Sequence, residues 1–240
     1  MKRKNTTLAA LTCASLLGSA ALSQAAVLWS LDFNGYADGE LSGAVGQPGF
    51  PGNWFNGSAS VTTGVVTSGT TTATLNQSFS AAVGATGTIW LSFDWGHNGP
   101  GDQAGTYGGL TFFEDNYPAL TEKGLLGNNW DSATWTGAAV STIGMKTAVA
   151  QITLSDLGNE TIKLWVGATG SPVNVSGTAD ATITGFEFSA VNALRVNGGN
   201  SQTFDNLKVG TTMLDVAAIP EPGSALLGGL GMLALLRRRR

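Results

Sequence analysis

The chain has 240 residues, of which 34 are glycine and only 12% are charged, a composition typical of one globular domain with appended ends. Seven of the 12 Lys and Arg residues occupy the first four and last four positions, whereas all 16 acidic residues lie between them. The interior therefore has five basic against 16 acidic residues, a net charge of −11. Such an interior cannot neutralise a run of phosphates, so nucleic acid is excluded as an expected partner.

Residues 1–25 have the three parts of a secretory signal peptide. Basic residues at positions 2–4 precede an apolar run at 8–22, and small residues occupy both recognition positions of the segment 23–25. We therefore predict export, with cleavage by signal peptidase after Ala25. Cys13, the single cysteine, lies in the part that is removed. The mature protein would then have no disulfide, no thiolate nucleophile and no cysteine metal ligand.

Residues 26–216 are predicted to form one all-β domain. Short apolar runs alternate with clusters of Gly, Asn, Ser, Thr and Pro, and no helical period persists over three turns. In the runs 27–34 and 89–95, apolar residues recur at every second position, so one face of each predicted strand turns toward a core. Further strands are predicted at 70–79, 109–113, 147–154, 161–166, 182–189, 194–196 and 203–209. About ten strands in one domain predict two packed antiparallel sheets, as in a jelly roll or related sandwich.

Five segments of the interior resemble a known family when they are taken in order. They are LDFNGYADGELSGAVGQPGF with Trp54, IWLSFDW (89–95), YGGLTFF (107–113), TIKLWVGATGSP (161–172) and FDNLKVGTT (204–212). In this order they resemble the strands of bacterial laminin-G-like domains, which have the concanavalin A-like lectin/glucanase fold. The resemblance implies an antiparallel jelly roll.

A ligand site is predicted in the polar segment 94–103, which we expect to be a loop. It brings Asp94, His97, Asn98 and Asp102 together with Trp95, a mixture that suits sugars or the oxygen ligands of calcium. The alternative is a polar strand connection held by Asn and Asp turn bonds. No cofactor is expected apart from calcium at this loop. A single histidine without cysteine leaves no common zinc ligand set.

Two tryptophans, Trp90 and Trp165, are further candidates for ligand binding because they lie opposite the apolar stripe of their strands. They could stack on sugar rings, as could Trp54, Trp130 and Trp135, although buried packing is the commoner fate of a strand tryptophan.

No catalytic residues are predicted. Glycoside hydrolases of the resembled fold carry a Glu-x-Asp-x-x-Glu array on one strand, and this array is absent from the sequence. Glu114 and Asp115 are adjacent, so on a strand they would point to opposite faces. We therefore expect a protein that is not an enzyme.

Residues 217–240 have the layout of a sorting tail. Pro220, Glu221 and Pro222 form an extended motif, residues 223–236 form a short apolar segment predicted to be a transmembrane helix, and Arg237, Arg238, Arg239 and Arg240 form a basic end. At about 21 Å, a 14-residue helix is short for a permanent membrane anchor. The layout resembles the PEP-CTERM signal, which implies recognition of residues 220–222 by an exosortase.

Together these features predict an exported, non-catalytic protein that is transiently anchored in the inner membrane and then reaches the cell surface or extracellular matrix. Polysaccharide is the expected ligand. Two alternatives remain open, namely a hydrolase or lyase acting on polysaccharide from a jelly-roll fold, and a structural coat protein without a ligand.

Overall fold

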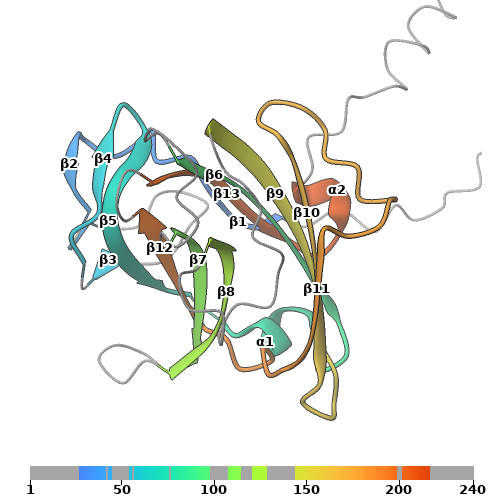
Figure 1. Cartoon of the computed structure of the whole chain (residues 1–240). Coiled ribbons are helices and arrows are strands. Elements are labelled where there is room, and N and C mark those ends of the chain that lie inside the picture. The colour runs from blue at the N-terminus through green and yellow to red at the C-terminus, as the bar shows by residue number, and fades with distance from the viewer. Residues whose placement is uncertain are drawn as a thin grey trace, which may run out of the picture.

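The computed structural model describes residues 27–41, 43–44, 54–55, 57–75, 77–97, 108–114, 121–128, 144–198 and 202–216. Every strand pair in these ranges is antiparallel. The strands form two layers (Figure 1). The expectation of an all-β antiparallel domain is confirmed.

Layer 1 has the central order β11-β10-β9-β6-β13, and β1 adds to β13. Its main strands are β1 (Val27–Leu31), β6 (Thr88–His97), β9 (Gly144–Thr153), β10 (Glu160–Ala168), β11 (Ala181–Phe186) and β13 (Gln202–Gly210). The short strands β2 (Gly39–Glu40) and β4 (Ser60–Thr62) extend this layer through β5.

Layer 2 has the order β5-β12-β7-β8, with the short strand β3 also paired to β5. Its strands are β3 (Trp54–Phe55), β5 (Val65–Thr74), β7 (Gly108–Glu114), β8 (Thr121–Asn128) and β12 (Ala193–Gly198).

The strand β5 belongs to both layers and turns the corner between them. Val66 pairs with β13 in layer 1, whereas the part from Gly69 onward pairs with β12 in layer 2. Gly69 has φ +75°, and a Cβ there would lie 2.2 Å from the carbonyl oxygen of Ser58. A side chain is therefore excluded at this corner by both backbone conformation and space.

One hydrophobic core fills the space between the layers. The predicted stripe on β6 is confirmed, because Ile89, Leu91, Phe93 and Trp95 are each at most 1% exposed. Layer 2 contributes residues such as Phe112, which is fully buried. The two layers therefore bury alternate residues of their strands against each other.

Two short helices pack against the strands. Helix α1 (Phe79–Val83) begins after Ser78, whose side-chain oxygen accepts a hydrogen bond from the N–H of Ala81. Phe79 is fully buried, with its ring centroid 6.2 Å from that of Trp29. Helix α2 (Met213–Val216) follows β13 directly and contacts β13 and β6.

The predicted strands differ from the structure in specific places. The strand expected at 70–79 begins earlier and ends at Thr74, because the Ser78 cap starts a helix instead. The first strand ends at Leu31 rather than at position 34, and Val27 is 51% exposed although it was assigned to the core stripe. Strands β2, β3, β4 and β8 were not predicted.

Candidate functional site

The polar segment 94–103 does not begin as a loop. Its first four residues, Asp94 to His97, belong to β6 and pair with β9 on one side and with β13 on the other. The expectation of a loop starting at Asp94 is therefore wrong. Asn98 and Asp102 lie outside the described residues, and for His97 only the backbone is described.

Strand alternation places Asp94 and Trp95 on opposite faces of layer 1. Trp95 turns into the core, where it is 1% exposed and its ring lies 5.5 Å from that of Phe93. The indole N–H of Trp95 has no hydrogen-bond partner among the described residues. Trp95 is consequently a core residue. The strand geometry separates it from Asp94, which corrects the expectation that both face one ligand.

The carboxylate of Asp94 lies on the outer face of layer 1 and is 7% exposed. The hydroxyl of Thr147 on β9 donates to its Oδ1 at 2.5 Å, and Nδ2 of Asn206 on β13 donates to its Oδ2 at 2.8 Å. Asn206 has φ +53° and lies at an irregularity of β13, where the register shifts between Asp205 and Lys208. This bulge carries the amide of Asn206 to the carboxylate.

A surface pocket of about 270 Å³ opens around these groups. The strands align its residues in cross-strand rows, in which Ser92 pairs with Lys208 on one side and with Val149 on the other. The pocket is lined by Ser92, Asp94, Thr147, Val149, Gly170, Ser171, Val173, Asn206, Lys208 and Val216. Its walls thus combine one carboxylate, one ammonium group, three hydroxyls and three valines.

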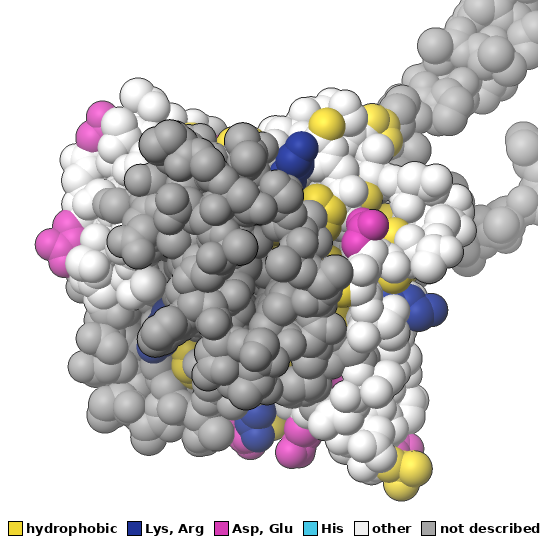
Figure 2. Space-filling model, in the orientation of Figure 1, with side chains coloured by type: hydrophobic (Ala, Val, Ile, Leu, Met, Phe, Trp, Pro, Cys, Tyr) yellow, Lys and Arg dark blue, Asp and Glu magenta, His cyan; other side chains and the backbone are white. Residues whose placement is uncertain are grey.

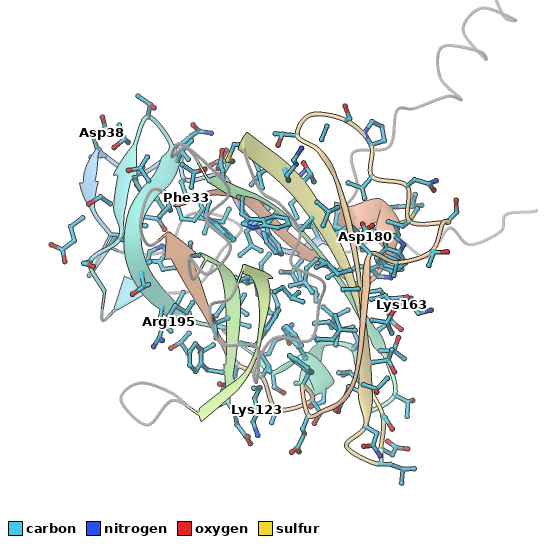
Figure 3. All side chains as sticks on the ribbon, in the orientation of Figure 1. Phe33, Asp38, Lys123, Lys163, Asp180 and Arg195 are labelled. Atoms are coloured by element: carbon cyan, nitrogen blue, oxygen red, sulfur yellow. The ribbon has the colours of Figure 1, made fainter. Side chains whose placement is uncertain are left out.

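Two segments outside the sheet form the rims of the pocket. Val216 at the end of α2 accepts a hydrogen bond from the hydroxyl of Ser92 at 2.8 Å, which fixes the helix to the sheet. The opposite rim comes from the connection between β10 and β11, which contributes Ser171 and Val173. In that connection Asp180 accepts a hydrogen bond from the N–H of Val166 at 2.7 Å (Figure 3).

Trp90 and Trp165 form a stacked pair on the same outer face, with ring centroids 6.1 Å apart and planes inclined by 15°. Trp165 is 6% exposed, and its indole N–H donates to the carbonyl of Gly177 at 3.1 Å. It therefore anchors the β10–β11 connection rather than offering a free ring to a ligand. Trp90 is half-buried. Trp54 is also buried, and Trp130 and Trp135 lie outside the described residues.

Asp205 of β13 lies opposite Asp94 of β6 in the strand pairing. Burial raises the pKa of its carboxyl from the ordinary 3.8 to about 6, and repulsion from Asp94 and Asp32 acts in the same direction. The hydrogen bond that it accepts from the N–H of Asn206, at 2.7 Å, opposes the increase in pKa. Sequence reasoning missed Asp205, Asn206 and Lys208, although they lie in the FDNLKVGTT segment that carries the family resemblance.

Charge is sparse on the visible surface of the described residues, where charged side chains occur singly or in small groups (Figure 2). No group of three or more His, Cys, Asp or Glu residues suited to a metal occurs within the described ranges. The calcium prediction includes Asn98 and Asp102, so it remains a prediction. None of the helices in the described part of the chain has the length and apolar character needed to cross a membrane.

Comparison with known families identifies the tail. Residues 218–240 match the PEP-CTERM protein-sorting motif, and this match includes the whole predicted recognition motif and the basic end. The chain therefore carries a PEP-CTERM sorting signal, which implies export and processing by an exosortase toward the cell surface. The predicted signal peptide at 1–25 and the domain boundaries at 26, 216 and 217 remain predictions. No curated protein sequence matches the chain.

Solved structures that match the chain include a lyase, a lumenal domain and a lectin. An endo-beta-1,4-glucuronan lyase from the fungus Trichoderma reesei has 15% identity and a TM-score of 0.42, covering 80% of this chain and 98% of the lyase. The exoplasmic/lumenal domain of VIP36, in its Ca2+/Man2-bound form, has 11% identity and a TM-score of 0.44, and the match covers 84% of this chain and 94% of the VIP36 domain. Peanut lectin has 12% identity and a TM-score of 0.38, and the match covers 76% of this chain and 97% of the lectin. Likenesses at this level carry no conclusion about ligand or activity.

Proposed function

We propose that this protein is an exported surface or matrix protein that binds polysaccharide without transforming it, on a jelly roll of the concanavalin A-like type. The observation that carries the proposal is the pocket on the outer face of layer 1. The sorting motif supports delivery to the cell surface, where polysaccharide is an accessible ligand. After processing of the tail, the domain acts in the cell envelope or extracellular matrix.

The chemistry of the pocket suits a sugar ring. Lys208 is exposed and donates hydrogen bonds, whereas Asp94 is an acceptor whose position is fixed by Thr147 and Asn206. Val173, which is half-buried at the rim, offers apolar contact to the C–H groups of a pyranose. A pocket of about 270 Å³ is slightly smaller than typical drug-sized sites, so we expect one sugar unit of a longer chain to occupy it.

The pocket also favours binding over catalysis. Hydrolysis of a glycosidic bond commonly uses two carboxyl groups that face one sugar from opposite sides. Asp94 is the one carboxylate among the described residues that line the pocket, and each of its oxygens already accepts a hydrogen bond. We therefore propose that Asp94 orients a sugar hydroxyl rather than transferring a proton.

Sorting is tested with the double substitution Pro220→Ala/Pro222→Ala, which removes the two residues that prevent a regular helix or strand at the motif. We expect the altered protein to stay in the inner membrane with its four terminal arginines intact. The native protein should lose this end. Mass spectrometry of the C-terminal peptide in both proteins distinguishes the outcomes, and an unprocessed native tail would refute exosortase sorting.

Binding is tested with a glycan array on the exported protein, with and without calcium. For a neutral polysaccharide that binds, Lys208→Gln should weaken the affinity at least fivefold in calorimetry. Lys163→Gln is the matched control, because Lys163 is also an exposed lysine of layer 1 but does not line the pocket. Release of new reducing ends or unsaturated sugars would support the enzyme alternative. No binding to any glycan would support the structural coat alternative.

A further inference from the structure

The outer face of layer 2 carries an arginine that forms no ion pair with any residue that the structure describes. Arg195 lies in β12 between Leu194 and Val196, which are 1% and 0% exposed in the core. Alternation therefore directs Arg195 to the opposite face. The antiparallel register places it beside Thr72 of β5 and Thr111 of β7.

The guanidinium of Arg195 is held in place by its neighbours. Its Nε donates to the hydroxyl of Thr72 at 3.0 Å, and its Cζ lies 4.4 Å from the centroid of the Phe113 ring. Thr72 is fully buried and Phe113 is 3% exposed, so both supports are rigidly packed. Because Nε is already used, the two terminal nitrogens are the donors that remain for a ligand.

The carboxylates near this face pair with a different cation. Lys123 of β8 forms ion pairs with Glu114 of β7 and, at 3.9 Å, with Glu187. Among the described residues, no carboxylate forms an ion pair with Arg195. Charged groups that are partly removed from water are normally paired, so the positive charge of Arg195 is available to an anion from outside the described chain.

We propose that Arg195 is the centre of a second binding site, which takes the carboxylate of an acidic sugar residue such as a uronate. The two terminal nitrogens of an arginine present parallel N–H groups that match the two oxygens of a carboxylate. Stacking on Phe113 orients the guanidinium before the ligand arrives and reduces the entropy lost on binding. The interior carries a net charge of −11, so the domain does not attract polyanions in general. Binding at Arg195 depends instead on the local match between its guanidinium and one carboxylate.

This inference rests on the proposed function, because it names one class of polysaccharide for the same protein. The two sites are spatially separate. Lys208 lines the pocket on layer 1, whereas Arg195 belongs to layer 2, and Figure 3 shows Arg195 and Lys163 on opposite sides of the molecule. A variant at one site therefore leaves the other intact, and the two hypotheses can fail independently.

The test measures calorimetric affinity of the exported protein for an oligosaccharide of glucuronate. The neutral comparison is the same oligosaccharide after its carboxyl groups have been reduced to alcohols. Arg195→Gln removes the charge, Arg195→Lys keeps the charge but loses the paired N–H groups, and Lys163→Gln is the control for a lost positive charge. We expect Arg195→Gln to weaken binding at least tenfold, Arg195→Lys at least fivefold, and Lys163→Gln less than twofold.

The reduced oligosaccharide should bind the native protein at least tenfold more weakly than the acidic one, and this comparison decides the question if Arg195→Gln does not fold. Equal affinity for the two oligosaccharides, or unchanged affinity of a folded Arg195→Gln variant, overturns the inference. Arg195-dependent binding of inorganic phosphate without binding of glucuronate would also overturn it. In each of these cases the proposed function still stands if the protein binds a neutral polysaccharide and Lys208→Gln weakens that binding.

Discussion

Asp205 gives the domain a pH-dependent stability that one substitution should remove. The raised pKa means that the folded protein holds the proton of this carboxyl more tightly than the unfolded chain does. The associated stabilisation is fully present below about pH 3.8 and is lost as the pH rises through about 6. Asp205→Asn mimics the neutral form at every pH, so it should stabilise the protein at pH 7.5 and have little effect at pH 3.5.

The size of the effect follows from the increase in pKa. An increase from 3.8 to about 6 corresponds to an upper limit of about 3 kcal/mol. The side chain is only half-buried, so solvent screening reduces the expected gain to about 1 kcal/mol. The amide oxygen of asparagine can still accept the hydrogen bond from the N–H of Asn206. For a domain of this size, about 1 kcal/mol corresponds to an increase in Tm of roughly 2–4 °C.

The measurement is the free energy of unfolding in urea between pH 3.5 and 7.5, with EDTA in the buffer. Asp156→Asn removes the same charge from an exposed turn and controls for the change in net charge. A gain for Asp205→Asn that is the same at both ends of the pH range would refute the reasoning. So would a loss of stability at pH 7.5, because repulsion and burial would then not be the dominant effects on this carboxylate.

Other substitutions test the packing around the two layers. Phe79→Ala should reduce the free energy of unfolding, measured in urea, by about 3–5 kcal/mol, since the ring is fully buried between the layers. A loss below about 1 kcal/mol would contradict the burial of this ring in the core. Gly69→Ala should cost more than about 2 kcal/mol, because φ is +75° and the added Cβ meets the Ser58 carbonyl. A thermal melt indistinguishable from that of the native protein would be inconsistent with a corner there. Trp165→Phe should cost about 1 kcal/mol and increase proteolytic cutting within 169–180, because the hydrogen bond to Gly177 is lost. Unchanged digestion, followed by mass spectrometry, would argue against the anchoring role.

The long strands were predictable because alternation between apolar and polar residues is strong within them. In β6 the sequence pattern identified the buried face correctly, but it placed the end of the strand too early. Gly96 was read as part of a loop, whereas it lies in the strand and pairs with β9 and β13. Glycine is required there because a Cβ would be 2.3 Å from the carbonyl oxygen of Gly144. A glycine that permits close approach of two backbones has the same appearance in a sequence as a glycine that begins a turn.

The candidate site was only partly predictable, since its residues meet through pairing of distant strands. Asp94 was identified from its polar surroundings, but its actual neighbours Thr147 and Asn206 come from β9 and β13. The bulge that places Asn206 against Asp94 has no periodic signal. Helix α1 was missed for a different reason, because five residues are too few to display a helical period.

The pairing of β1 with β13 determines when the fold can be completed. Val27 lies beside Gly210, so the first strand gains its hydrogen-bonded neighbour only after nearly the whole chain has been delivered. A contact between such distant positions is entropically expensive to close and is expected to form slowly. The sandwich can therefore close only after β13 has been delivered, and closure brings the two ends of the described domain to the same edge.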